Sequence, residues 1–513
     1  MRKWTCLRRC FADQPALEQL CDRLVIQGEA KQLYALPAAE PEALQFAARM
    51  GFSLPQTESF CKTDLLLCAE ADDEASADAV LAKITSAALL RPESGSSTRF
   101  TNPDFALAAC PEADLAAVGV RNDYAAAVAA KCLAAGKGVL LMSDIPYAQE
   151  LPLRKAAAEQ QLPFFGSGAA GAMLCRQPLG ICPPFSEGDT AILAASFTAA
   201  LSLAFLLQRG GAGVRHILPV GRRDCFAECG GSSTRYFLEA LAADPESRTL
   251  ALLYKAGDFE LLGHLTEHAR SLQKQLYVYG SGQLKSGAFA ETLGFAPSLA
   301  QLAHSICTAQ GKQGLAFLTD EEAAAMAAPY KEQLSPQQRY LRGLFLSDTM
   351  CGEIAAGLLE PLGAVWSNRP VRAIHLLQDL HYLKEHSVVD FGDTKLGYSV
   401  RCALQTPLAR NRRIITESHN RTVSLILTDW YGAEGCDEQY LSHLCSCIRT
   451  AKETARADGR PLAVGCVVYT AACSPVSEQR TLQLLREAGA EVFFSADDAA
   501  LFAKHLLSTE EPH

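Results

Sequence analysis

Residues 188–224, GDTAILAASFTAALSLAFLLQRGGAGVRHILPVGRRD, decide the fold class of this chain. The run predicts a strand at 190–195, a turn at 196–198, an apolar helix at 199–208, a glycine-rich stop at 210–213 and a second strand at 214–220. A strand, a helix and a second strand in this order form a βαβ unit, and such units build parallel sheets. We therefore expect an α/β protein.

The turn of this unit is where a phosphate would bind, because free backbone N–H groups and the helix dipole converge there. Close approach of a phosphate to the backbone favours glycine. Residues 194–199 read AASFTA, with no glycine and with Phe197 in the middle. The sequence thus combines the architecture of a phosphate-binding enzyme with a degenerate turn, in which Ser196 and Thr198 are the expected phosphate donors.

Length and composition limit the possible partners. The 513 residues are too many for one core and predict about three or four domains. The net charge of −10 argues against nucleic acid, because no basic patch offsets the acid excess. A small phosphorylated ligand, other protein subunits or a second copy of the chain are the expected partners.

Cysteine usage and hydropathy predict a cytoplasmic protein. The 19 cysteines are scattered and mostly lie in apolar runs, as buried thiols do in a reducing compartment. The N-terminal stretch has no apolar run long enough for a signal peptide. Residues 191–208 carry no charge and reach the length of a membrane span, but their strand-like start and glycine-rich stop predict a buried strand and a buried helix instead. We expect no membrane association.

The alternation of strands and helices predicts four domains. Residues 1–95 form a small α/β domain, and the polar, serine-rich run at 91–102 reads as a linker. Residues 103–186 form a Rossmann-like domain, and residues 188–330 and 340–508 form two doubly wound parallel sheets in tandem. A helix is expected at 371–386, with His375, His381 and His386 on it.

Gly166, Gly168 and Gly171 match the pattern G-x-G-x-x-G of dinucleotide-binding turns and follow a predicted strand. That pattern should open a long helix, but Pro178 limits any helix here to a few residues. The loop can therefore contact a nucleotide or CoA, or it can be a plain tight turn.

Arg223 and Asp224 follow another predicted strand, at the edge of the sheet where ligands bind. At the rim of a pocket they can clamp a carboxylate or a phosphate together with Arg222. An Arg–Asp pair that braces the loop is the alternative.

Two further motifs raise the question of a metal, and we expect none. His443 and Cys447 share a helix face, but tetrahedral zinc needs more ligands than the sequence offers nearby. Asp390 and Asp393 end a predicted strand, where they can bind Mg²⁺, act as a base or cap a turn.

Several separated motifs carry a resemblance to a known family. They are Met142-Ser143-Asp144, the stretches at 210–231 and 238–245, Gly343-Leu344-Phe345 with Thr349, and the Asp-Phe-Gly-Asp run at 390–393. In this order they resemble the FdrA family, acyl-CoA synthetase-like proteins related to the succinyl-CoA ligase α subunit, over nearly the whole chain.

The resemblance implies a CoA-binding Rossmann-like domain followed by two flavodoxin-like ligase domains. It also implies a subunit of an oxamate carbamoyltransferase-type complex in purine and allantoin nitrogen catabolism. An ADP-forming acyl-CoA synthetase and a catalytically silent scaffold subunit are the alternatives. CoA or another phosphate-containing ligand is the cofactor that the resemblance implies.

The chain departs from the family at its ligand-binding loops. The glycine-rich turns of the family are replaced at 166–171, at 194–199 and at 346–349, where we expect Asp348 to repel a phosphate. A further family run is replaced by SVRCALQT at 399–406. The loop at 280–287 has no histidine, so the phosphohistidine chemistry of succinyl-CoA ligases is not expected.

Overall fold

The computed structural model describes residues 1–513 except 8–16, 18, 19, 23, 26, 27, 39, 40, 55–63, 90–101, 256, 282–287, 370–374, 381, 394–399, 472, 473 and 509–513. The chain divides into two compact units, Met1–Arg99 and Phe100–His513. Both are built of strands and helices together, so the α/β fold class is confirmed. The expected linker at 91–102 and the loop at 280–287 lie largely outside the described residues.

The first unit is an antiparallel three-stranded sheet in the order β1-β3-β2. Leu66 and Leu67 on β3 point to opposite faces, as successive strand residues do, and each belongs to its own apolar cluster. The elements are β1 (Arg2–Leu7), β2 (Gln32–Pro37), α2 (Pro41–Arg49), β3 (Leu65–Glu70) and α3 (Glu74–Leu89). The edge strand β1 was not predicted, because the charges of Arg2 and Lys3 obscure its alternation.

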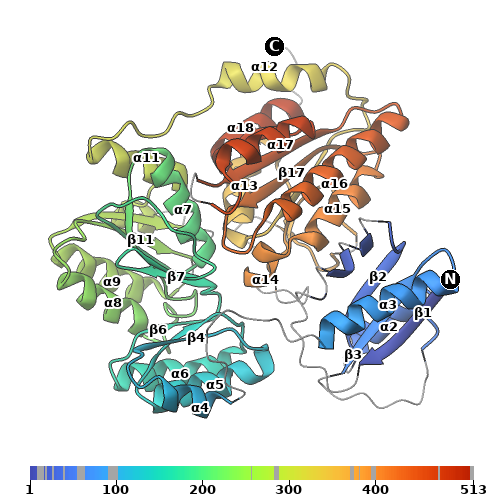
Figure 1. Ribbon diagram of the computed structural model, residues 1–513. Helices are drawn as coiled ribbons and strands as arrows, with labels where there is room; N and C mark the ends of the chain where they lie inside the picture. The colour runs from blue at the N-terminus through green and yellow to red at the C-terminus, as the bar shows by residue number, and fades with distance from the viewer. Residues whose placement is uncertain are drawn as a thin grey trace. The chain divides into compact units, whose positions relative to one another are not determined.

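The second unit begins with a parallel three-stranded sheet in the order β4-β5-β6 (Figure 1). Val139, Leu140 and Leu141 of β5 are fully buried, as expected for the central strand. The elements are α4 (Pro103–Ala109), β4 (Leu115–Val118), α5 (Asn122–Ala134), β5 (Gly138–Leu141), α6 (Tyr147–Glu159) and β6 (Phe164–Phe165).

A six-stranded sheet follows, in the order β12-β11-β9-β10-β7-β8. The four strands β9 to β12 are parallel, and the hairpin β7-β8 adds to β10 in antiparallel orientation. The elements are β7 (Gly171–Leu174), β8 (Gln177–Gly180), β9 (Thr190–Ala194), α7 (Phe197–Arg209), β10 (Val214–Pro219), α8 (Ser232–Ala242), β11 (Thr249–Tyr254), α9 (Phe259–Ser271), β12 (Gln275–Gly280), α10 (Ala288–Leu293) and α11 (Leu299–Ala309).

A seven-stranded sheet, parallel throughout, completes the unit in the order β15-β14-β16-β13-β17-β18-β19. Its elements are β13 (Tyr340–Phe345), α13 (Asp348–Leu362), β14 (Val365–Ser367), β15 (His375–Leu376), β16 (His386–Asp390), α14 (Val400–Gln405), α15 (Leu408–Ser418), β17 (Val423–Tyr431), α16 (Glu438–Ala457), β18 (Ala463–Tyr469), α17 (Glu478–Glu487), β19 (Glu491–Phe493) and α18 (Ala496–Leu507).

The prediction of a helix at 371–386 is wrong for those residues of the range that the structure describes. Residues 375 and 376 form β15, which pairs with β14, and the His375 ring lies 4.7 Å from the Trp366 ring. His386 is the first residue of β16. Pairing with neighbouring strands therefore overrides the local helical pattern. His381 lies outside the described residues.

Helix α7 joins the two large sheets. All its residues from 197 to 207 are buried, because it packs on β9 and β10 of its own sheet and on α13 and β18 of the other. This explains why the run carries no charge, since a helix buried on all sides is apolar all round. Within the described residues, no helix combines the length and hydropathy that a membrane crossing requires.

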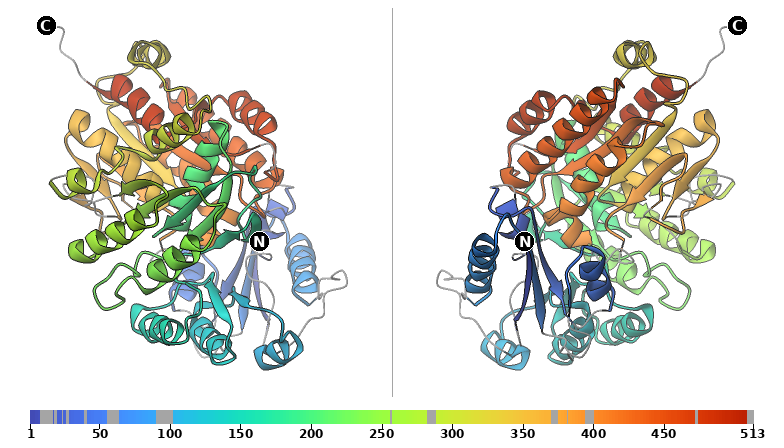
Figure 2. Two further views of the ribbon diagram at one scale, coloured as in Figure 1. Left: turned by 90° about the vertical axis from the view of Figure 1, so that its left-hand side faces the viewer. Right: turned by 90° about the vertical axis from the view of Figure 1, so that its right-hand side faces the viewer.

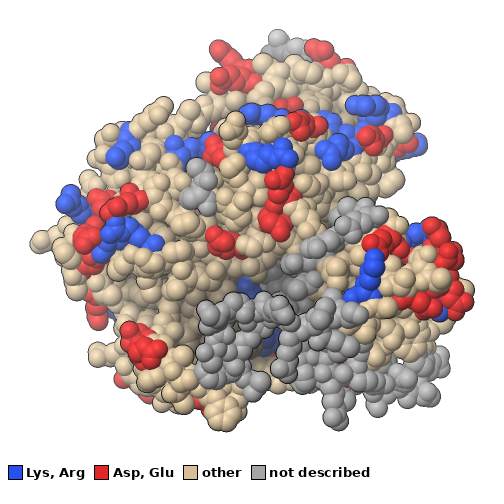
Figure 3. Space-filling model, in the orientation of Figure 1, with Lys and Arg blue, Asp and Glu red and all other residues tan. Residues whose placement is uncertain are grey.

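The chain connects the two large sheets through α12 (Asp320–Lys331), which lies against α18 (Figure 2). On the face drawn in Figure 3, acidic and basic side chains of the described residues are interspersed rather than separated into patches. The finer division of the second unit into three domains stays a prediction.

Candidate functional site

A pocket of about 430 Å³ lies where the carboxyl ends of strands from three sheets converge. Ligands bind beyond the carboxyl ends of the strands in open α/β sheets, which makes this pocket the candidate site. Its lining residues lie on the loops and helix starts that follow β4, β5, β6, β9, β10, β11, β13, β14 and β16. They include Asp144, Gly168, Ser196, Arg222, Lys255, Asp348 and Arg369.

Four helices start at this pocket, α5, α6, α7 and α13, and the last two begin at a serine. Ser196 is the N-cap residue of α7 and makes no side-chain capping bond, and Ser347 is the N-cap residue of α13 and accepts a bond from the Met350 N–H. Thr198 and Thr349, in the first turns of these helices, have hydroxyl oxygens 3.2 Å apart. The N-terminus of a helix carries a partial positive charge and free N–H donors. The pocket wall is therefore suited to an anion.

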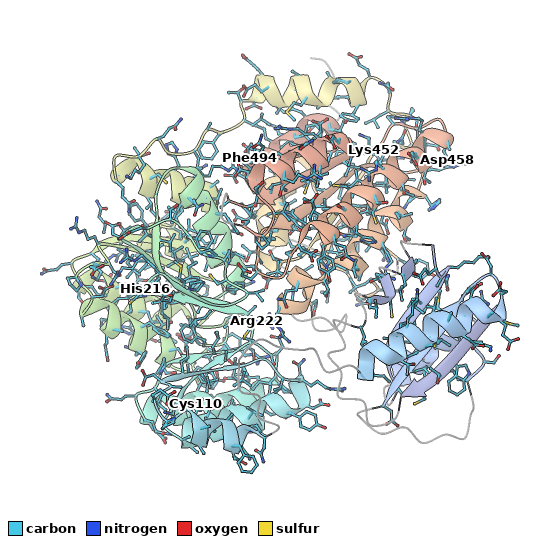
Figure 4. The ribbon with its side chains drawn as sticks, viewed as in Figure 1. Cys110, His216, Arg222, Lys452, Asp458 and Phe494 are labelled. Atoms are coloured by element: carbon cyan, nitrogen blue, oxygen red, sulfur yellow. The ribbon has the colours of Figure 1, made fainter. Side chains whose placement is uncertain are left out.

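Four cationic side chains line the pocket, and three of them are held in place. Arg223 donates to the Ile145 carbonyl at 2.7 Å, Lys255 is ion-paired with Asp348, and Arg369 is ion-paired with Asp390 at 2.8 Å. Figure 4 labels the fourth, Arg222, on the loop beyond β10. Arg222 is exposed and has no hydrogen bond or ion pair with any residue that the structure describes. Its guanidinium is available to a ligand.

A chain of buried charges supports Arg223. Its guanidinium contacts Glu150 at 2.5 Å, Glu150 contacts Arg154 at 2.7 Å, and Arg154 contacts Asp224 at 2.8 Å. Glu150, Arg154 and Asp224 are almost completely buried. Burial alone would raise the pKa of Glu150, but Arg154 and Arg223 outweigh it and hold the pKa below its usual value. The network holds the Arg223 guanidinium in a fixed direction.

The carboxylates of the pocket fall into two kinds. Burial raises the pKa of Asp144 to about 6, although Arg223, Arg222 and Arg369 oppose this shift. Burial also opposes ionisation of Asp348, but Lys255 and Arg369 outweigh it and lower the pKa of Asp348. The positive charge of Lys255 therefore compensates the negative charge of Asp348. This reduces the repulsion of phosphate that the sequence predicts.

The three glycines of the G-x-G-x-x-G pattern occupy three different environments. Gly168 lines the pocket and has φ +89°, which only glycine adopts easily. A Cβ at Gly166 would lie 1.9 Å from Nη2 of Arg154, so this glycine makes room for the buried network. Gly171 is the first residue of β7, where a Cβ would lie 2.7 Å from neighbouring backbone atoms. The loop leads into a hairpin, without a helix.

The other expected site residues also lie in different environments. Ser196 and Arg223 line the pocket, whereas Thr198 is buried and contacts Thr349 behind the pocket wall. Asp224 does not lie at the rim. It is completely buried and accepts bonds from the N–H groups of Ser233 and Thr234 at the start of α8. This corresponds to the loop-bracing alternative.

The motifs considered for metal binding form other contacts. His443 and Cys447 approach to 3.8 Å, and Nδ1 of His443 lies 3.1 Å from the Asn411 amide nitrogen. Asp390 accepts bonds from Arg369 and from the Gly392 N–H, as the turn alternative requires. Among the described residues, no group of three His, Cys, Asp or Glu side chains is arranged to hold a metal.

Sequence reasoning missed Lys255, Arg369 and Asp144 as pocket residues. Each is a charged residue within a few positions of the end of a buried strand: LALLY before Lys255, VWSN before Arg369 and GVLLMS before Asp144. A charged residue shortly after a buried strand is therefore a signal that the sequence contains. The sequence does not show that strand ends from three sheets meet at one pocket.

Fold and pocket together define a multi-sheet α/β protein with an anion-suited site at its strand ends. No family model matches the chain. The chain is 26% identical over 467 residues to the uncharacterized protein YahF of Escherichia coli (strain K12), covering 90% of each.

Solved structures similar to parts of this chain include two enzymes. One is the dinucleotide forming acetyl-coenzyme A synthetase 1 of Ca. Korarchaeum cryptofilum in complex with phosphate and ADP (14% identity, 77% of this chain and 82% of that chain, TM-score 0.28). The other is the ATP citrate lyase of Methanothrix soehngenii in complex with citrate and coenzyme A (14% identity, 42% of each chain, TM-score 0.33). Because both TM-scores are low, these similarities do not indicate what the pocket binds. The chemistry of the pocket is therefore inferred from its own residues.

Proposed function

We propose that this pocket binds a phosphate-type dianion beside a reactive carbonyl group, and that the chain transfers an acyl group between CoA and phosphate. This is the phosphate half of an ADP-forming acyl-CoA ligase reaction. One observation carries the proposal: the starts of α7 and α13 and four cationic side chains meet in one pocket. Each charge-assisted hydrogen bond to a bound anion contributes about 1.5–3 kcal/mol.

The residues have distinct roles in this proposal. Arg222 and the first-turn N–H groups of α7 bind the phosphate oxygens. Arg223 and Arg369, fixed by their carboxylate partners, supply positive charge where negative charge develops on the carbonyl oxygen. The loops of Asp144 and Gly168, beyond β5 and β6, receive the CoA side of the substrate.

The test uses the purified chain with acyl-CoA and inorganic phosphate. We expect release of free CoA, measured by chromatography, that depends on phosphate and is accompanied by an acyl phosphate signal in the ³¹P NMR spectrum. Arg222→Gln should reduce this release, and Arg421→Gln, an exposed arginine outside the pocket, should not. Phosphate-independent hydrolysis, or no reaction, would contradict the proposal.

Carbamoyl transfer, implied by the FdrA resemblance, is the second candidate, because carbamoyl phosphate is also a mixed anhydride of phosphate. Adding oxamate and carbamoyl phosphate to the same assay tests it, with oxalurate as the expected product. A silent scaffold subunit would show neither reaction and no binding of phosphate or CoA.

A further inference from the structure

Asp144 lines the pocket, and no side chain among the described residues holds its carboxylate. Its backbone N–H donates to Oδ1 of Asn122 at 3.1 Å, which fixes the loop beyond β5. Within the described part of the chain, no donor forms a hydrogen bond to the carboxylate itself. The carboxylates of Glu150, Asp348 and Asp390 are all ion-paired. Asp144 therefore differs from them in being free to contact a ligand.

The charges around Asp144 come from several elements. Arg222 and Arg223 on the loop beyond β10, Glu150 on α6 and Arg369 beyond β14 act on its carboxylate. Asp123, at the start of α5, and the Lys255–Asp348 pair line the same pocket. Burial raises the pKa of Asp144 to about 6 and outweighs the three arginines. Such a carboxyl group both accepts and donates a proton close to neutral pH.

We propose that Asp144 is the proton-transferring catalytic residue of this pocket, taking the proton of the attacking phosphate and giving it to the leaving sulfur. The inference rests on the proposed function. In the step R–CO–SR′ + HOPO₃²⁻ → R–CO–OPO₃²⁻ + HSR′, the phosphate O–H loses its proton to the Asp144 carboxylate, the O–C bond forms and the C–S bond breaks. The sulfur then takes the proton, and the carboxylate is restored.

The first test is the pH dependence of phosphate-dependent CoA release. The wild-type rate should fall below about pH 6, where Asp144 is protonated and cannot accept a proton. Asp144→Asn should lower kcat by about 10²- to 10⁴-fold with little change in KM for phosphate, and the acidic limb should disappear. Asp144→Glu should restore part of the rate and the limb, and Asp114→Asn, an exposed aspartate outside the pocket, should behave as wild type.

The second test needs no turnover and uses sulfate, which does not titrate between pH 5 and 8. Protonation removes a negative charge that faces the bound anion, so wild-type affinity for sulfate should rise below about pH 6. Asp144→Asn should bind tightly at every pH in this range, and Asp114→Asn should follow wild type. Unchanged thermal melting shows that each variant is folded.

The outcomes separate the two proposals. If CoA release is normal in Asp144→Asn and keeps its acidic limb, the inference about Asp144 is overturned and the proposed function stands. If the wild type shows no phosphate-dependent release, the proposed function fails and the proton transfer fails with it. In that case the sulfate titration still shows whether Asp144 faces an anion site.

Discussion

The hydroxyl oxygens of Thr198 and Thr349 lie 3.2 Å apart, although the two residues are separated by 151 positions in the chain. Each is the third residue of a Ser-x-Thr turn that leads from a parallel strand into a buried helix. The contact therefore fixes the starts of α7 and α13 against each other. It also determines the shape of the pocket wall.

Replacing these hydroxyls should show a coupling between the two helix starts. We expect Thr198→Val and Thr349→Val each to destabilise the protein. Thr198→Val removes the contact of the buried Thr349 hydroxyl, and Thr349→Val leaves the Thr198 hydroxyl with Ser196 at 3.1 Å as its remaining hydroxyl contact. A double-mutant cycle followed by chemical denaturation should give a coupling energy of about 0.5–1.5 kcal/mol. Additive effects would contradict the contact, and Thr416→Val on α15 provides an exposed control.

Asp224 should be important for stability through its buried ion pair. Asp224→Ala removes the partner of Arg154 and the cap of α8, and breaking a buried pair from one side costs about 3–5 kcal/mol. Glu438→Ala, which breaks the exposed Arg480–Glu438 pair, should have a much smaller effect, because solvent screens exposed charges. Equal shifts in the denaturation midpoints of the two variants would contradict the structural role of Asp224.

Gly166 should not tolerate even a methyl group. A Cβ there would lie 1.9 Å from Nη2 of Arg154 and 2.4 Å from Oε1 of Glu150, so Gly166→Ala should destabilise by about 1–3 kcal/mol and displace Arg223. Gly136→Ala is the matched control: its φ is +70° but no atom lies within 4 Å of the added Cβ, so it should cost about 1 kcal/mol from backbone strain alone. Thermal melting would detect the difference.

The Lys255–Asp348 pair predicts how stability depends on pH. Lys255 and Arg369 lower the pKa of Asp348 below the ordinary 3.8. A carboxyl group with a lowered folded-state pKa stabilises the protein above its unfolded pKa and loses this contribution as the pH falls further. Asp348→Asn should therefore melt lower than wild type at pH 7, and the gap should close below about pH 4. A gap that is the same at both pH values would show that charge is not its origin.

Local patterns were sufficient to predict most of the elements. The buried strands β9 and β11 are apolar after their first threonine, and α7 begins two residues before its predicted start. The hairpin β7-β8 was missed because the residues at 171–180 suggest a glycine-rich loop. The hairpin pairs with β10, and short-range sequence patterns contain no information about such a partner.

The site was predicted less completely, for a related reason. Ser196, Gly168 and Arg223 were expected from local motifs, and all three line the pocket. Gly166 and Asp224 belong to similar motifs but serve the Arg154 network, because only the folded chain brings α6 next to the loop beyond β10. A motif identifies residues near a strand end. It does not distinguish a residue that lines the pocket from one that holds the lining residues in place.

The most direct test of the central claim is a calorimetric titration of the purified chain with inorganic phosphate. If the pocket is an anion site, the wild type binds phosphate, and Arg222→Gln binds it about 10- to 100-fold more weakly, because one charge-assisted contact is lost. Arg421→Gln should match the wild type. No heat of binding in the wild type, or equal affinity in Arg222→Gln, would contradict the assignment of this pocket as the functional site.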